Sequence, residues 1–319
     1  MTVFTALGAH IVDVLGRPVS EIPAGQGSAR LTEIRMTAAG AAGGTAVDLA
    51  RLGGTVRSLG AVGADNLGRF LLDQLVSVGI DITRMVVVPE IQTSATILPI
   101  RANGERPALH VPGATAALSA AHVPTSQIEG TDFLHVGGPD ALGSFSADVL
   151  PGLLRSARAA GTVTSADLLS TVRAGARQAL SEVLAQVEHL LINAEQASAL
   201  TGLTDAPDAA LALLNDGPQV VVVTTGNRGG VLADPDGWFS FPAMDVEVVD
   251  TTGCGDAFSA GYLRALSLGW PPREACGLGS ACASLVAATL GSDGLTDLPT
   301  ALRVLADSDR YRAGARAGR

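Results

Sequence analysis

The chain has 319 residues, and its 21 basic and 31 acidic side chains give a formal charge of −10. This acidic balance excludes a nucleic-acid binder that works through a broad basic face. Every basic residue is Arg, which also excludes a Lys-dependent phosphate loop and Schiff-base chemistry.

Short β-branched or apolar runs alternate along the chain with Ala- and Leu-rich stretches of helical spacing. In chain order, the runs predicted to be strands cover 3–7, 56–62, 85–88, 93–100, 133–136, 189–192, 220–224 and 230–233. The stretches predicted to be helices cover 45–52, 68–78, 147–160, 174–184, 195–200, 209–215, 256–268 and 273–288. Strands that alternate with helices predict a mostly parallel sheet with helices on both faces.

Two regions break this alternation. Residues 14–36 have weak periodicity, and residues 91–112 form two extended stretches around a hairpin-like turn at 102–105. We expect these two segments to form a small β lid over the edge of the sheet. Because no linker-like stretch interrupts the chain, we expect one α/β domain over residues 1–319 that carries the lid. The last ten residues are rich in Arg and are expected to form a loose basic tail.

The most informative stretch is 250–261, which reads DTTGCGDAFSAG. Gly253 and Gly255, followed by small residues at helical spacing, predict a tight loop that opens into a helix. Such a loop presents backbone N–H groups at the positive end of the helix dipole, which is an anion site. Asp256 in the first helical turn can accept a proton from an attacking hydroxyl while the N–H groups neutralise a transferred phosphoryl group.

This stretch resembles the second signature of the ribokinase (PfkB) family of carbohydrate and nucleoside kinases, with Cys254 where Ala, Ser or Gly is usual. Other stretches follow the family's order: 49–53 with 59–68 resembles its first signature, 104–106 its lid turn, 193–196 its Asn-x-x-Glu region and 225–229 its nucleotide-side loop. The resemblance implies a ribokinase-like α/β fold, with a mostly parallel central sheet, helices on both faces and a small β lid.

The resemblance also implies roles for individual residues. Asp256 would be the catalytic base, and the N–H groups of Gly253, Cys254 and Gly255 would form the anion hole. Asp13 matches the acidic residue that binds the hydroxyl groups of the acceptor, and Gly40 matches one of the glycines that line the acceptor site.

The nucleotide side would comprise Asn193, Thr225, Gly226 and Gly229, with Mg²⁺ bridging the phosphates of ATP. The region of Asp250 and Thr252 resembles the monovalent-cation site of some members, which would hold an ion such as K⁺.

Two positions depart from the family's pattern. Gly44 stands where the family has an Asn that reads the acceptor, so we expect the acceptor to be read differently. Gln196 stands where the family has the Glu of Asn-x-x-Glu, with Glu195 one position earlier, so water-mediated contacts to Mg²⁺ are expected to be weaker or rearranged. Asp167 lies near the family's Asp-x-Asn element, but Leu169 replaces the Asn, which leaves a site residue and an ordinary strand-end Asp as alternatives.

Cysteine usage points to a compartment and to one reactive group. Three cysteines without CxxC spacing favour a reducing cytoplasm over a disulfide framework. At a helix N-terminus, Cys254 is expected to have a lowered thiol pKa and to be open to oxidation. The N-terminus lacks the pattern of a signal peptide, and no apolar run reaches the roughly 18 residues of a membrane span.

We therefore expect an ATP- and Mg²⁺-dependent kinase that phosphorylates an alcohol group of a small sugar or polyol. The lid segments contain no Phe, Tyr or Trp on which a base could stack, which favours a sugar over a nucleoside. A nucleoside kinase of the same family is the alternative, and a ribokinase-like binding protein without turnover is a further one, which Gly44 and Gln196 motivate. We expect neither a nucleic acid nor a membrane as partner, and a homodimer through the lid is consistent with the resemblance.

Overall fold

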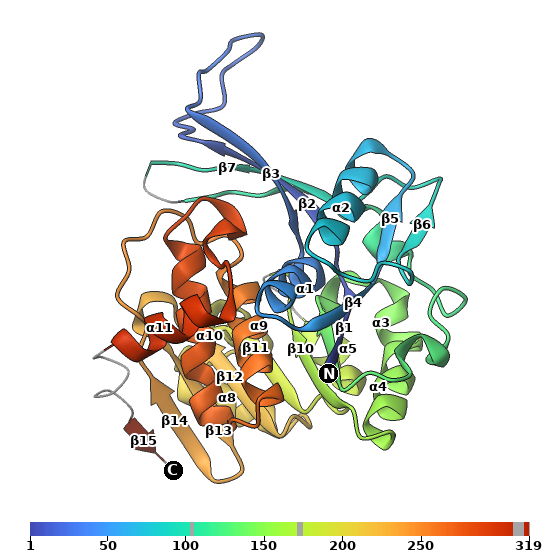
Figure 1. Ribbon diagram of the computed structural model, residues 1–319, viewed down its shortest axis with the longest axis vertical. Coiled ribbons are helices and arrows are strands. Elements are labelled where there is room, and N and C mark those ends of the chain that lie inside the picture. Colours follow the sequence, from blue (N-terminus) through green and yellow to red (C-terminus); the bar gives the residue numbers. More distant parts are fainter. Residues whose placement is uncertain (103–104, 171–174, 309–315, 319) are drawn as a thin grey trace.

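The computed structural model describes residues 1–102, 105–170, 175–308 and 316–318, and Figure 1 shows a body built on a large sheet with a lid that projects from it. The turn expected at 102–105 lies partly outside the described residues, as does Ala174, where a helix is expected to begin. None of the described helices combines the length and the apolar character that crossing a membrane requires.

The central sheet of the described chain has nine strands in the order β15-β14-β13-β12-β11-β10-β9-β1-β4. Neighbours from β4 to β12 run parallel, whereas β13, β14 and β15 are each antiparallel to the strand before. The bounds are β1 Val3–Gly8, β4 Thr55–Leu59, β9 Phe133–Gly137, β10 Val163–Asp167, β11 His189–Asn193, β12 Val220–Thr224, β13 Gly230–Asp234, β14 Gly237–Phe241 and β15 Arg316–Gly318.

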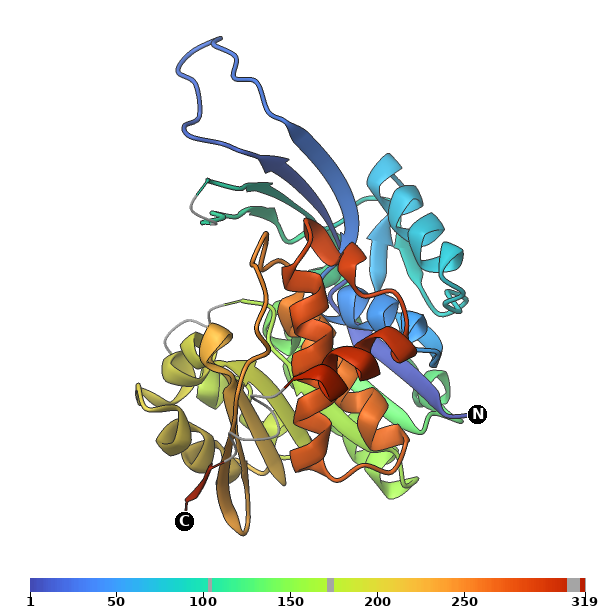
Figure 2. The ribbon, with the colours of Figure 1, turned by 60° about the vertical axis from the view of Figure 1, so that its left-hand side comes forward.

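Helices cover both faces of this sheet (Figures 1 and 2). One core contains side chains of α1 Ala41–Arg51, α2 Asn66–Ser77, α9 Cys254–Ser267, α10 Pro272–Ala287 and α11 Leu298–Asp307. The other contains side chains of α3 Ser144–Asp148, α4 Leu150–Ala159, α5 Ala176–Ala179, α6 Ser181–Leu184, α7 Ala194–Thr201 and α8 Ala206–Leu214. Val220 and Val222 of β12 pack into the first core, whereas Val221 and Val223 pack into the second. A parallel strand buried on both faces needs such a continuous apolar run.

The lid is a four-stranded sheet in the order β3-β2-β7-β8. Its strands are β2 Ile11–Arg17, β3 Glu33–Ala39, β7 Ala95–Pro99 and β8 Leu109–Val111, so both segments expected in the lid contribute to it. Side chains alternate between its faces. Asp13 and Thr96 point toward the body and line a cavity, whereas Ile34 and Ile97 are exposed on the outer face. The residues between β2 and β3 extend well beyond the body (Figure 2).

The strand expected at 56–62 is two strands. β4 stays in the central sheet, whereas β5 Ala61–Gly63 leaves it to pair with β6 Val86–Val88. Gly60 lies between the two strands, and a side chain there has no room because a Cβ would lie 2.4 Å from His10 Nδ1. The remaining short helices are η1 Gly113–Ala117, η2 Thr125–Ile128, η3 Pro139–Ala141, η4 Gly226–Arg228 and η5 Gly291–Gly294.

The expectation of a loose tail is wrong in part. Residues 316–318 form β15, which pairs with β14 through the register of Trp238 with Gly318. Backbone pairing with an exposed sheet edge requires no particular side chains, so the Arg-rich composition gave no signal for this strand.

Candidate functional site

A cavity of about 390 Å³ lies between the lid and the carboxyl ends of the central strands. Such a position, where parallel strands end, is where α/β sheets bind their ligands. The cavity brings together predicted site residues from distant parts of the sequence: Asp13, Gly40, Gly44, Asn193, Thr252, Gly253, Gly255 and Asp256. Its described lining does not include Cys254, Thr225, Gly226, Gly229 or Asp250.

The predicted nucleotide-side loop follows β12, whose last residue, Thr224, lines the cavity. The loop is closed by a hydrogen bond of 2.7 Å from the Thr225 N–H to the Gly229 carbonyl, with η4 between them. Thr225, Gly226 and Gly229 therefore lie beside the cavity rather than in it.

The predicted anion loop begins α9. Gly253 is the residue before the helix, and its φ of 78° lies in the left-handed region that favours glycine. The N–H groups that follow belong to the first turn, where the helix supplies no acceptors for them. A Cβ at Gly255 would meet no atom within 4 Å, so the space in front of the loop is open. This geometry suits a phosphoryl group.

Asp256 is a cavity carboxyl whose pKa is raised. Burial raises its pKa well above the ordinary value, and the negative charges of Asp167, Asp48 and Asp13 raise it further, while Arg106 opposes them. A carboxyl with a raised pKa is a stronger base once it is ionised. Positive charge that a ligand brings into the cavity would favour that ionised form.

Gly44 faces this carboxyl directly. A Cβ at Gly44 would lie 2.3 Å from Asp256 Oδ2, whereas a Cβ at the neighbouring Gly43 would have its nearest contact at 3.4 Å. The Asn that the resemblance leads one to expect at position 44 has no room while Asp256 holds this position. The departure at Gly44 thus concerns the room left for Asp256 as well as the expected reading of an acceptor.

Asp13 and Arg106 reach the cavity from the lid. Burial raises the pKa of Asp13 to about 6, against the opposing effects of a hydrogen bond with Thr96 and the charge of Arg106. Arg106 donates to both the Oγ1 and the carbonyl oxygen of Thr251, each at 3.3 Å. The sequence placed Arg106 only in the lid turn, because its contact with the start of the anion loop depends on how the lid folds over the body.

Asp167 lies at the end of β10 with only 7% of its surface exposed. Its Oδ2 lies 3.5 Å from His135 Nε2, and its Oδ1 has no hydrogen-bond partner among the described residues. Burial raises the pKa of this carboxyl. Asp167 lines the cavity, so of the two alternatives that the sequence left open, the structure favours a site residue.

Gln196 is engaged by three backbone groups. It forms a capping box with Asn193: Gln196 Oε1 accepts from the Asn193 N–H at 3.0 Å, and Asn193 Oδ1 accepts from the Gln196 N–H at 2.9 Å. Gln196 Nε2 donates to the carbonyl oxygens of Leu168 at 2.9 Å and Ser170 at 3.3 Å. The Gln196 side-chain amide thus holds the segment that follows Asp167 through these two hydrogen bonds.

The donor set of the cavity fits a magnesium ion that arrives with phosphates. No group of three His, Cys, Asp or Glu side chains in the described chain is arranged to hold a metal. The orphaned Oδ1 of Asp167, however, is a carboxylate oxygen of the kind that Mg²⁺ prefers. Mg²⁺ commonly combines one or two protein carboxylates with substrate phosphates.

The expectation that the thiol pKa of Cys254 is lowered is wrong. Burial raises the pKa of its thiol to about 12, and the nearby Asp250 and Asp256 add to this effect. The thiol points away from the loop and lies 3.5 Å from the carbonyl oxygen of Ala283 on α10. The helix N-terminus would favour the thiolate, but loss of hydration outweighs it here.

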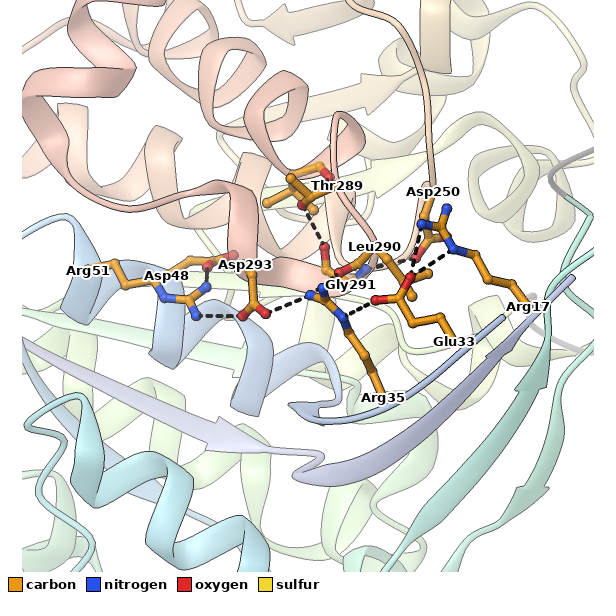
Figure 3. Close-up of polar contacts among 11 residues, drawn as sticks. Arg17, Glu33, Arg35, Asp48, Arg51, Asp250, Thr289, Leu290, Gly291 and Asp293 are labelled. Carbon is orange, nitrogen blue, oxygen red and sulfur yellow. Dashed lines mark hydrogen bonds and ion pairs between the residues drawn. The ribbon is translucent and has the colours of Figure 1, made fainter. Parts of the chain in front are cut away.

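Both carboxylate oxygens of Asp250 accept hydrogen bonds from groups of the protein. Its Oδ1 accepts from the N–H and the hydroxyl of Thr252 at 3.0 and 2.8 Å, and its Oδ2 accepts from the Gly291 N–H at 3.1 Å. Figure 3 shows this carboxylate beside the loop of η5. A monovalent cation in this region would therefore depend on backbone carbonyls, and that expectation stays a prediction.

Ion pairs connect the lid with this same loop (Figure 3). On β3, Arg35 pairs with Glu33 at 2.7 Å and with Asp293 of η5 at 2.9 Å, and it donates to the Leu290 carbonyl at 3.1 Å. Asp293 also pairs with Arg51 of α1 at 3.2 Å. The lid is thus linked through η5 both to α1 and to the start of the anion loop.

The chain resembles known proteins over most of its length. The family described as pfkB family carbohydrate kinase matches residues 3–300. Aminoimidazole riboside kinase from Salmonella typhimurium is 30% identical over 272 residues, which cover 82% of this chain and 84% of that protein. ATP-dependent ribose-1-phosphate kinase from Halopiger xanaduensis is 30% identical over 288 residues, which cover 90% of this chain and 92% of that protein.

The fold of this chain also matches the folds of solved structures. An E. coli protein described as a ribokinase II, in complex with ATP and Mg²⁺, superposes with a TM-score of 0.82 over 96% of this chain and 99% of that chain, at 23% sequence identity. This likeness confirms the predicted ribokinase-like fold with its mostly parallel sheet and β lid.

Proposed function

Because the chain belongs to the pfkB family of carbohydrate kinases and is therefore a phosphotransferase, we propose that it transfers the γ-phosphoryl group of ATP to an alcohol group of a small sugar or polyol. One observation carries the proposal: Asp256, the open anion loop and Asp13 line one cavity beneath the lid. ATP as donor is supported by two relatives, the Halopiger enzyme described as ATP-dependent and the E. coli protein in complex with ATP and Mg²⁺.

In the proposed reaction, Asp13 accepts hydrogen bonds from the hydroxyl groups of the acceptor. Asp256 takes the proton of the attacking hydroxyl, and the N–H groups of Gly253, Cys254 and Gly255 neutralise charge on the transferred phosphoryl group. Arg106 adds a positive charge at the start of the same loop. The lid excludes water, which would otherwise compete with the acceptor.

Donor binding is assigned to the neighbouring strand ends. Asn193 begins α7 in the cavity wall, and Thr225, Gly226 and Gly229 form the adjoining loop, so together they would contact the nucleotide. When bound, Mg²⁺ would neutralise and align the phosphates. A monovalent cation such as K⁺ near Asp250 and Thr252 remains part of the proposal.

The acceptor is proposed to be a sugar or polyol because the lid presents polar side chains to the cavity, together with the aliphatic side chains of Ile11 and Leu98. Thr37, Thr96 and His110 line it from the lid, and no Phe, Tyr or Trp of the lid does so within the described residues. The alternative is a nucleoside kinase, which the similarity to a riboside kinase favours.

The test is release of ADP from ATP and Mg²⁺ in the presence of separate pools of sugars, polyols and nucleosides, with Asp256→Asn as the matched variant. We expect turnover with a sugar or polyol pool and a loss of roughly 10²–10⁴-fold in kcat for the variant. Turnover with nucleosides alone would support the alternative. Ligand-induced thermal stabilisation without turnover in any pool would instead support a binding protein.

We further propose a homodimer through the outer face of the lid. Ile34 and Met36 of β3, Ile97 of β7, and Leu109 and Val111 of β8 are all exposed there. Because the strands are paired side by side, these side chains form one apolar face, which a second copy could cover in a self-complementary interface. Light scattering should show a dimer for the native chain and a monomer for Ile97→Glu. A native monomer at micromolar concentration would contradict this proposal.

The three free cysteines support a reducing compartment such as the cytoplasm.

A further inference from the structure

Asp48 is a buried carboxyl that the proposed reaction does not use. It lies in α1, is 0% exposed, and its Oδ2 has no hydrogen-bond partner among the described residues. Its Oδ1 accepts from Arg51 Nη1 at 3.4 Å, a long contact within one turn of the helix. A buried carboxylate with so few partners is costly, and an apolar side chain in its place would often be as stable or more so. Stability alone therefore does not explain an Asp at this position.

The position of Asp48 on α1 brings it close to Asp256. It follows Gly44 by four residues, so the two lie on one face of α1. A Cβ at Gly44 would overlap Asp256 Oδ2, and the Thr45 hydroxyl lies 3.5 Å from the Asp256 carbonyl oxygen, so this part of α1 packs against the first turns of α9. Burial is the main cause of the raised pKa of Asp256, and among the charges that raise it further, Asp48 comes second to Asp167. Asp48 thus acts on Asp256 through its charge.

Arg51 is the counter-ion of Asp48. Burial raises the pKa of Asp48 to about 7, while the charge and the hydrogen bond of Arg51 oppose this rise and the charge of Asp293 adds to it. Arg51 is shared with Asp293, at 3.2 Å, and Asp293 in turn pairs with Arg35 of the lid (Figure 3). Above about pH 7 Asp48 is therefore ionised, and its counter-ion belongs to a chain of ion pairs that ends in the lid.

The other ionisable groups near α1 do not provide Asp48 with a second cation. Cys254 of α9 and Cys282 of α10 face it; burial raises the pKa of both thiols, and the charge of Asp48 adds to each shift. The remaining groups on elements that pack against α1 have partners elsewhere: Arg57 of β4 with the Glu129 carbonyl oxygen, His135 of β9 with Asp167, Arg264 of α9 with the Leu52 carbonyl oxygen, and Glu33 of β3 with Arg35. The negative charge of Asp48 is thus balanced by Arg51 and is otherwise directed at α9.

We propose that Asp48 is a positioning residue of the phosphoryl transfer: its buried negative charge makes Asp256 a stronger base, and Arg51 keeps that charge in place. The inference rests on the proposed kinase function, in which Asp256 accepts the proton of the acceptor. Two carboxyls that repel each other titrate as a pair. Once Asp48 is ionised, loss of the proton from Asp256 becomes harder, so the titration of Asp256 should extend to higher pH than that of a lone carboxyl.

Carbon-13 NMR of the aspartate carboxyl groups tests this without turnover. The resonance of Asp256 is the one that disappears in Asp256→Asn, and its position is followed as the pH is raised. Asp48→Asn keeps an acceptor for Arg51 and the shape of the side chain but removes the charge. We expect the midpoint of the Asp256 titration to fall by at least about half a pH unit in this variant, and the curve to become that of a single proton. Asp48→Ala provides a second variant if the first does not fold.

Asp73→Asn is the matched control, since Asp73 is an exposed carboxyl of α2 and its loss changes the net charge equally. We expect it to leave the Asp256 titration where it is in the native chain. The proposal is overturned if the midpoint is the same in Asp48→Asn and in the native chain, or if Asp73→Asn moves it as far as Asp48→Asn does.

Arg51→Gln tests the counter-ion. Without Arg51, Asp48 should hold its proton to higher pH, so Asp256 should titrate at lower pH than in the native chain. The same substitution should not lower the midpoint when Asp48 is already Asn. An equal fall in both backgrounds would show that Arg51 acts on Asp256 without Asp48, and would overturn its role as counter-ion.

Turnover provides a readout that a merely structural role would not move. With saturating acceptor and ATP, kcat of Asp48→Asn should reach its plateau at lower pH, and the plateau should be roughly two- to threefold lower because Asp256 is then a weaker base. A lower kcat with an unmoved pH profile would overturn the proposal. Failure of the kinase function is a separate result: the native chain would then show no turnover with any acceptor pool, whatever the midpoint of Asp256.

Discussion

Gly44 leaves room for the carboxyl of Asp256, the proposed base. α1 packs against α9 so closely that a single added carbon at Gly44 would overlap Asp256 Oδ2, at 2.3 Å. The sequence shows that the Asn expected at this position is missing, but it does not show the contact with a residue more than two hundred positions away.

We predict that Gly44→Ala lowers kcat by at least about 10²-fold, because the new methyl group displaces the general base. Gly43→Ala is the control. Both glycines lie in α1, but a Cβ at Gly43 has only ordinary contacts, so this variant should keep its activity. Steady-state kinetics with matched protein concentrations decide the comparison, and equal activities of the two variants would contradict the prediction.

The raised pKa values of the cavity predict how the rate depends on pH. Burial raises the pKa of Asp13 to about 6 and that of Asp256 well above its ordinary value. A base must be ionised to accept a proton, so activity should be full above these values and should be lost as the pH falls through them. We expect kcat/KM for the acceptor to decline already below about pH 6, rather than near the pKa of about 3.9 of an unperturbed Asp. A profile that stays flat down to about pH 5 would argue against these shifts in the working enzyme.

At the scale of elements, α7 and α8 each begin with a side chain that caps the helix, but only the cap of α7 lies in the cavity wall. Asn193 begins α7 and accepts from the Gln196 N–H at 2.9 Å, and Asp205 begins α8 and accepts from the Asp208 N–H at 3.2 Å. Asn193 lines the cavity, whereas Asp205 is not among the described lining residues. Capping alone therefore cannot distinguish a structural from a functional Asn193.

We predict that Asn193→Ala and Asp205→Ala each lower the free energy of unfolding by about 1 kcal/mol, as the loss of a cap does. Only Asn193→Ala should also weaken binding of ATP. Denaturant unfolding and calorimetric titration with ATP measure the two effects. Equal ATP affinity of the two variants would limit Asn193 to a structural role.

At the scale of the whole molecule, the lid is fastened to the body by exposed charges. Asp293, whose side chain is 58% exposed, pairs with Arg35 of the lid and with Arg51 of α1 (Figure 3). Ion pairs of such exposure contribute little to global stability. Loss of the pair between Arg35 and Asp293 should instead change how firmly the lid is held against the body, since few other ion pairs of the described chain join the two.

We predict that Asp293→Ala changes the free energy of unfolding by less than about 1 kcal/mol. It should nevertheless raise the acceptor KM and speed amide hydrogen exchange in β3, because the closed lid loses an anchor. Asp216→Ala is the control, since it removes the ion pair of 2.7 Å with Arg177, which lies outside the lid. Unchanged exchange in β3 of Asp293→Ala would show that the lid does not depend on this pair.

The sequence by itself determined the class of fold and the family, and it predicted the anion loop. These depend on local signals: apolar runs of strand length, helical spacing, and a Gly-x-Gly-Asp stretch whose backbone geometry neighbouring residues set. The lid strands within 14–36 and the strand β10 have weaker periodicity, so the sequence alone does not distinguish them as separate elements.

Only the tertiary structure decided the chemistry of individual side chains. Cys254 has a helix-terminal position that predicts a lowered pKa, yet packing against α10 buries the thiol and raises it. The buried, unpartnered Oδ1 of Asp167 and the hydrogen bond from Gln196 Nε2 to the Leu168 carbonyl oxygen both depend on how β10 and α7 pack in the fold. The physical reason is common to these cases: hydration, charge and hydrogen-bond partners are set by atoms that lie far apart in the chain, whereas periodicity and loop chemistry are set by near neighbours.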